Sequence, residues 1–187
     1  MKSTLIGGIV GGLVVFIWGA ISHMVLPIGE AGIQSLPNED AVVGAMRSSI
    51  AQPGFYFFPG MNIHGHPSEA EKKAWEEKYR TGPTGILVYQ PTGGRALSPK
   101  QLVMELLSNI LGALIAACLL TKVAGTYWSR VGTVAGLGLF AWIAIEFSYW
   151  NWYGFPWDYT AAQAVDQVVG WGLGGLAMAQ LVKPPGA

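Results

Sequence analysis

Long apolar runs and one long polar segment divide this chain. Runs of about 20 apolar residues, the length that an α-helix needs to cross the hydrocarbon core, occupy positions 5–26, 102–123, 131–150 and 161–182. Short connections join the last three runs, so we expect these helices to be antiparallel neighbours. The pattern predicts an all-α integral membrane protein with four transmembrane helices.

The long polar segment predicts a small α+β extramembrane cap between the first and second transmembrane helices. The sequence Ser68-Glu69-Ala70-Glu71 has the capping-box pattern of a helix start. Positions 55–58 and 86–89 are rich in the aromatic and β-branched residues that are typical of strands. The chain therefore divides into a first transmembrane helix (1–26), a cap (27–100) and three further transmembrane helices (101–187).

Composition supports the membrane assignment. The chain is 51% hydrophobic and 12% charged, whereas a soluble domain carries about 25% charged residues. Its formal net charge is zero, which gives no reason to expect a nucleic acid partner. The single cysteine, Cys118, cannot form a disulfide within the chain.

The basic residues near short loops predict the orientation in the membrane. If the chain crosses four times, one side receives Lys2, Lys122, Arg130 and Lys183. The opposite short loop, 151–160, has Asp158 as its charged residue. Because cytoplasmic loops carry an excess of lysine and arginine, we expect both termini in the cytoplasm. The cap would then lie on the periplasmic side of a bacterial inner membrane.

Each apolar run is interrupted by an ionisable residue. These four residues are His23, Glu105, Glu146 and Asp166. Ionisable side chains are costly inside a membrane, so they normally face the bundle interior and often mark a site. Helical periodicity places each of them on the same face as small residues, which transmembrane helices use at close contacts. Their depths predict one cluster near the outer face, with four polar neighbours: Ser108, Asn109, Gln163 and Gln167.

Three interpretations of this cluster remain open. In the first, the groups hydrogen-bond to one another and fix the register of the helices. In the second, the histidine and carboxylates bind a divalent metal such as Mn, Fe or Zn, although the Glu-x-x-His spacing of di-iron bundles is absent. In the third, the cluster relays protons or binds a quinone. His64 and His66 either add metal ligands or lie in a solvated turn.

No motif of a known catalytic chemistry occurs in the sequence. The phosphate-binding loop, the dinucleotide fingerprint, the Gly-x-Ser-x-Gly elbow and the His-Glu-x-x-His motif are all missing. We therefore expect a non-catalytic accessory or assembly subunit of a larger membrane complex. Its partners would be the lipid bilayer and other membrane subunits or a second copy of the chain. The alternative is a membrane-embedded metal, proton or quinone site at the cluster, and an enzyme acting by itself ranks third.

Overall fold

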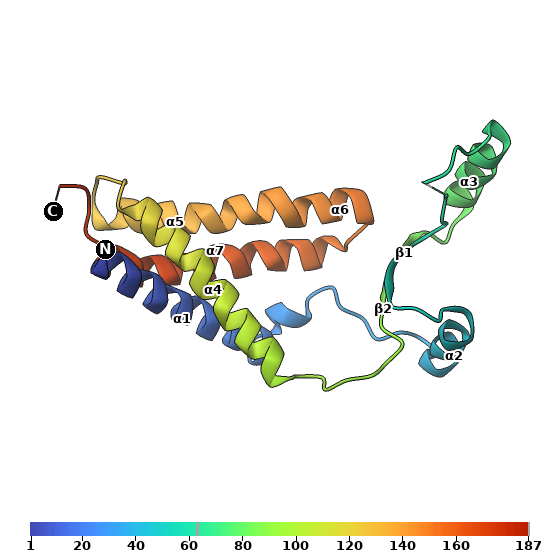
Figure 1. Ribbon diagram of the computed structural model, residues 1–187, viewed down its shortest axis with the longest axis horizontal. Coiled ribbons are helices and arrows are strands. Elements are labelled where there is room, and N and C mark those ends of the chain that lie inside the picture. The colour runs from blue at the N-terminus through green and yellow to red at the C-terminus, as the bar shows by residue number, and fades with distance from the viewer. Residues whose placement is uncertain (63, 187) are drawn as a thin grey trace. The chain divides into compact units, whose positions relative to one another are not determined.

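The computed structural model describes residues 1–62 and 64–186, which form two compact units (Figure 1). The first unit combines Met1–Ile33 with Ala96–Ala187, and the second is Gln34–Arg95. The first unit contains α1 (Lys2–Met24), a 3₁₀ helix (η1, Pro27–Glu30), α4 (Pro99–Leu120), α5 (Tyr127–Ala141), a π-helical turn (η2, Trp142–Glu146), α6 (Phe147–Tyr153) and α7 (Trp157–Leu181).

Three helices of the described chain are long and apolar enough to cross a membrane, which is compatible with an integral membrane protein. They are α1, with a mean hydropathy of 2.2, α4, with 2.1, and the continuous helix Tyr127–Tyr153, with 1.6. The fourth predicted span corresponds to α7. This helix has 25 residues but is not among the three, because polar side chains and glycines lower its hydropathy.

The helix starts in the first unit follow from local capping. Helix α4 begins at Pro99, earlier than the predicted start at 102, because the Ser98 hydroxyl accepts from the Gln101 backbone N–H and the Gln101 side chain accepts from the Ser98 N–H. Helix α5 begins after Thr126, whose hydroxyl accepts from the Ser129 N–H at 3.2 Å. Figure 1 shows α5 continuing through η2 into α6 as one rod.

Helices α1 and α7 pack side by side in antiparallel directions. A Cβ added at Gly7 would lie 2.5 Å from Val182 Cγ2, and one at Gly11 would lie 2.6 Å from Met178 Cγ. Further along, a Cβ added at Gly170 would lie 2.7 Å from Trp18 Cδ1. The two helices therefore approach closely because glycine occupies the contact positions, as expected from the sequence.

A second glycine face of α1 packs against α4. A Cβ at Gly8 would lie 2.6 Å from Leu114 Cδ2, and one at Gly12 would lie 2.5 Å from Ile110 Cα. Helix α1 therefore lies between α4 and α7. The buried hydrophobic cluster that these helices share with α5 consists of Ala113, Ala116, Ala117, Leu120, Val134, Met178 and Val182.

The second unit contains α2 (Glu39–Ser49), β1 (Gly54–Phe58), α3 (Glu69–Thr81) and β2 (Gly85–Tyr89). The two predicted strands form an antiparallel pair. The predicted capping box is confirmed at the start of α3, where Ser68 and Glu71 bond reciprocally. The unit is thus a two-stranded sheet with two short helices.

Candidate functional site

Three of the four predicted ionisable residues line one cavity of the first unit. His23 lies in the last turn of α1, and Glu105 and Asp166 lie in the N-terminal halves of α4 and α7. The C-terminal end of α1 meets those halves because α1 runs antiparallel to both helices. The cavity between the three helices has a volume of about 380 Å³.

The lining of this cavity is acidic, amidic and aromatic. Its polar residues are His23, Glu105, Asn109, Asp166 and Gln167. Its aromatic residues are Phe16, Trp18 and Trp171. Among the described residues that line it, there is no lysine or arginine. With the histidine neutral, the lining carries two ionisable carboxyl groups and no fixed positive charge.

Two amide side chains of the cavity are held by hydrogen bonds. Asn109 Nδ2 donates to Glu105 Oε1 at 3.2 Å, one helical turn away on α4. Trp171 Nε1 donates to Gln167 Oε1 at 3.2 Å on α7. These bonds orient the Glu105 carboxyl and the Gln167 amide on facing helices, and they leave the Gln167 NH₂ group as a donor.

Asp166 is held through its backbone and not through its side chain. Trp18 Nε1 on α1 donates to the Asp166 carbonyl oxygen at 3.1 Å. The Asp166 side-chain oxygen Oδ1 is buried and has no hydrogen-bond partner among the described residues. A buried polar atom without a partner is uncommon in folded proteins and calls for an explanation.

The His23 ring is oriented by its own helix. Nδ1 lies 2.9 Å from the Ser22 hydroxyl and 3.1 Å from the Gly19 carbonyl oxygen. In the tautomer in which Nδ1 donates to Gly19, Nε2 is left as an acceptor. Ser22 itself is fully buried, whereas His23 is exposed.

The predicted neighbours Asn109 and Gln167 line the cavity, and the three remaining predicted residues, Glu146, Ser108 and Gln163, are not among its described lining residues. Glu146 ends the π-helical turn η2 and is not among the described residues of the cavity lining. Neither Ser108, whose hydroxyl donates to the Glu105 carbonyl at 2.9 Å, nor Gln163 lines it. In the described chain no three His, Cys, Asp or Glu residues are placed to hold a metal ion. The metal interpretation of the four residues thus gains no support and stays a prediction.

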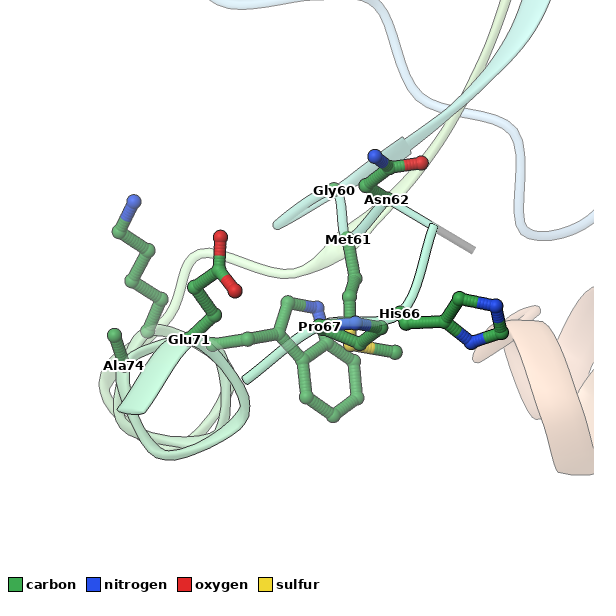
Figure 2. Close-up of a pocket in the computed structure, with 9 residues that line it drawn as sticks. Gly60, Met61, Asn62, His66, Pro67, Glu71 and Ala74 are labelled. Atoms are coloured by element: carbon green, nitrogen blue, oxygen red, sulfur yellow. The ribbon is translucent and has the colours of Figure 1, made fainter. Parts of the chain in front are cut away.

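A second hollow, of about 280 Å³, lies in the second unit (Figure 2). Its polar groups are used locally: Asn62 Oδ1 accepts from the His64 and Gly65 N–H groups. The Glu71 carboxylate accepts from Ser68. Figure 2 shows the His66 side chain directed away from Glu71, and both histidines of this loop are exposed. These local hydrogen bonds hold the loop and the start of α3 in place, and we assign this hollow no ligand.

Arg130, which in the sequence is one of the basic residues near a short loop, is a structural residue of the bundle. It is 4% exposed. Its Nη1 donates to the Ala179 carbonyl at 3.1 Å, and its Nη2 donates to those of Leu120 and Val182 at 3.3 and 2.9 Å. The guanidinium therefore binds the C-terminal ends of α4 and α7. The sequence signal for this role is the position of Arg130 in the first turn of α5. A positive charge is unfavourable at a helix N-terminus unless the C-terminus of another helix lies close enough to stabilise it.

Comparison of the chain with protein-family models, with curated proteins and with solved structures finds no match. The class of protein is therefore defined by the fold. It is a mostly helical chain with a small two-stranded sheet and with three helices, in the part that the structure describes, that are long and apolar enough to cross a membrane.

Proposed function

We propose that this chain is a non-catalytic accessory or assembly subunit of a larger membrane complex. It would cross a bacterial inner membrane four times, with both termini in the cytoplasm. The fourth crossing, the orientation and the association with a partner are supported by three separate features of the first unit.

The fourth crossing is supported by the pairing of α7 with α1. Contacts between the two helices extend from Gly7 with Val182 to Trp18 with Asp166. Because α7 lies beside α1 over most of its length, α7 would also lie within any membrane that α1 crosses. The polar side chains Asp166 and Gln167 line the cavity, while Val165 and Val169 of the same helix are exposed and suit a lipid contact.

The orientation is supported by the positions of the charged ends. Lys2 and Lys183 line the same hollow at one end of the bundle, and Lys122 in the connection from α4 to α5 is exposed. The positive-inside rule assigns this end to the cytoplasm. Arg130 adds less to this argument than the sequence suggested, because its charge is buried against helix carbonyls.

The association with a partner is supported by the outer face of α5, which is the observation that carries the proposal. Outside the neighbouring backbone of α5 itself, a Cβ added at Gly132 or Gly136 would meet no atom within 4 Å in the described chain. Both glycines are exposed, and Trp128 and Phe140 on the same stripe are each 69% exposed. By contrast, the GxxxG pairs of α1 and α7 contact neighbouring helices.

A small-residue face gains nothing from lipid tails but allows a second helix to approach closely. Gly132-x-x-x-Gly136 thus has the spacing of a helix contact, yet no other helix of the described chain packs against it. The exposed rings of Trp128 and Phe140 at either end of this pair add apolar area to the same face. We assign this face, residues 128–140 of α5, to a helix of another membrane polypeptide.

Native mass spectrometry of the protein, extracted gently from its own membrane, tests this proposal. We expect a particle heavier than the 20.0 kDa chain, with a second polypeptide in fixed ratio. The variant with Gly132→Leu and Gly136→Leu should lose that polypeptide while keeping its helical circular dichroism. The matched control is Cys118→Leu, which adds bulk at an exposed position of α4 and should keep the partner.

Two results would overturn the proposal. The first is a particle that contains only one or several copies of this chain. The second is a double-leucine variant that retains the second polypeptide at the wild-type ratio, since the α5 face would then not be the contact.

A further inference from the structure

We propose that the cavity between α1, α4 and α7 binds a small amphipathic amine, by which we mean a primary ammonium group attached to an apolar or aromatic body. This inference is independent of the α5 face. It rests on the charge of the lining, on one unpartnered oxygen and on the aromatic walls.

The charge of the lining favours a cation. Glu105 and Asp166 are the ionisable carboxyl groups of the cavity, and no lysine or arginine is among its described lining residues. Ionised carboxylates accept hydrogen bonds and cannot donate them. A ligand that approaches both helices must therefore bring donors, and an ammonium group brings three together with a positive charge.

The hydrogen-bond inventory favours a donor as well. Asp166 lines the cavity, and its Oδ1 is buried without a hydrogen-bond partner among the described residues, so this carboxyl group has an unused acceptor. The indole donors Trp18 Nε1 and Trp171 Nε1 are already bonded to the protein, and Asn109 Nδ2 uses one of its two hydrogens on Glu105. A quinone, whose carbonyl oxygens only accept, would be left with the amide N–H groups of Asn109 and Gln167 and would face two carboxyl groups.

The walls of the cavity fit the remainder of such a ligand. Phe16, Trp18 and Trp171 contribute aromatic surface, and aromatic faces attract organic cations, tryptophan most strongly. The volume of about 380 Å³ lies within the range of small-molecule sites, roughly 300–1,000 Å³. Residues that suit the ammonium group and residues that suit the apolar body therefore line the same cavity.

Binding of phenethylamine to the full-length protein tests the proposal. The protein would be placed in nanodiscs of phosphatidylcholine and phosphatidylglycerol and titrated by isothermal calorimetry, with 2-phenylethanol as the uncharged probe. We expect saturable binding of one phenethylamine per chain and weaker binding of the alcohol. Asp166→Asn and Glu105→Gln should each weaken the amine roughly tenfold to a hundredfold, as expected for the loss of a charged hydrogen bond.

The matched control is Glu146→Gln, which removes a carboxyl group from the same bundle but outside the cavity lining and should leave the affinity unchanged. Circular dichroism checks the fold of every variant. If Asp166→Asn does not fold, Glu105→Gln decides, because Glu105 is an exposed side chain whose replacement leaves the packing intact.

The same ammonium chemistry also occurs in the headgroup of phosphatidylethanolamine. A parallel native mass spectrum, recorded from nanodiscs that contain this lipid, distinguishes the two sources. One retained phosphatidylethanolamine per wild-type chain, lost in Asp166→Asn and competing with phenethylamine, would assign the ammonium group to a lipid.

The proposal is overturned if phenethylamine shows no saturable binding, if the alcohol binds equally well, or if Glu146→Gln weakens binding as much as Asp166→Asn does. Preferential binding of a short-chain ubiquinone over phenethylamine would also overturn it.

Discussion

Arg130 in the first turn of α5 donates from Nη2 to the carbonyl oxygen of Val182, at 2.9 Å, just beyond the end of α7. The same nitrogen reaches Leu120, the last residue of α4, at 3.3 Å. Helix C-termini expose unpaired carbonyl groups and carry a partial negative charge. One buried guanidinium therefore joins the beginning of α5 to the ends of α4 and α7, without a carboxylate partner in the described chain.

Replacing Arg130 with methionine should destabilise the bundle by about 3 kcal/mol or more, because several carbonyl groups lose a charged donor while staying buried. Equilibrium unfolding in mixed detergent micelles would measure the loss. Arg130→Lys should recover part of it, because an ammonium group keeps the charge but cannot span three carbonyls in a planar fork. A methionine variant as stable as the wild type would show that these bonds contribute nothing net.

Glycine substitutions should separate internal helix contacts from the outer face of α5. A Cβ at Gly12 would lie 2.5 Å from Ile110 Cα, and one at Gly138 would collide with the Gln167 carbonyl. Because both obstacles are backbone atoms, Gly12→Ala and Gly138→Ala should each cost about 1–3 kcal/mol of unfolding free energy. The matched control, Gly136→Ala, meets open space in the described chain and should gain up to about 1 kcal/mol in the isolated protein. Equal effects at all three positions would contradict the packing described here.

The capping box of α3 should make the second unit sensitive to acid. The Ser68 backbone N–H and hydroxyl donate to the Glu71 carboxylate and hold its pKa below the ordinary value. A lowered folded-state pKa stabilises the fold above the pKa of the unfolded chain, about 4.3 for glutamate, and this stabilisation is lost as the pH falls through the folded value. The protection factor of the Ser68 amide, which compares its exchange rate with the intrinsic rate at the same pH, should therefore fall on acidification through that range. Glu71→Gln should remove this fall, and a wild-type protection factor that is flat with pH would argue against the box.

Fusion reporters should establish how often the chain crosses the membrane. Four crossings with cytoplasmic termini predict a fluorescent green fluorescent protein, and an inactive alkaline phosphatase, at the C-terminus. Alkaline phosphatase inserted at the exposed turn 91–94 should be active, because that segment would be periplasmic. An active C-terminal phosphatase would instead mean that α7 does not cross.

The sequence predicted elements whose causes are local. The apolar runs indicated the positions of α1, α4, α5–α6 and α7, and the pattern around Ser68 indicated the start of α3. Periodicity placed His23, Glu105 and Asp166 on inner helix faces, and in the structure these three residues line one cavity, because residues at the adjoining ends of antiparallel neighbouring helices lie close together.

The sequence could not predict features that depend on the pairing of specific helices. Glu146 was expected at the same depth and on the same inner face as the other three residues. In the structure it ends the π-helical turn η2 and is not among the described residues that line their cavity, and a π-helical turn cannot be read from a 3.6-residue period. Similarly, the GxxxG pairs in α1 and α5 look equivalent in sequence. Only the three-dimensional packing shows that Gly7 and Gly11 lie against the C-terminal end of α7, while Gly132 and Gly136 lie against no other described element.

The pairing of α1 with α7 has a consequence for biosynthesis. Helix α1, which is translated before the other described helices, packs through Gly7 and Gly11 against Val182 and Met178, at the end of the last described helix. Until α7 emerges, those glycines of α1 have no partner within the chain, and the Arg130 guanidinium lacks two of its three carbonyls. The described bundle therefore cannot close before α7 has been translated, because its first helix and the Arg130 guanidinium both depend on contacts from α7.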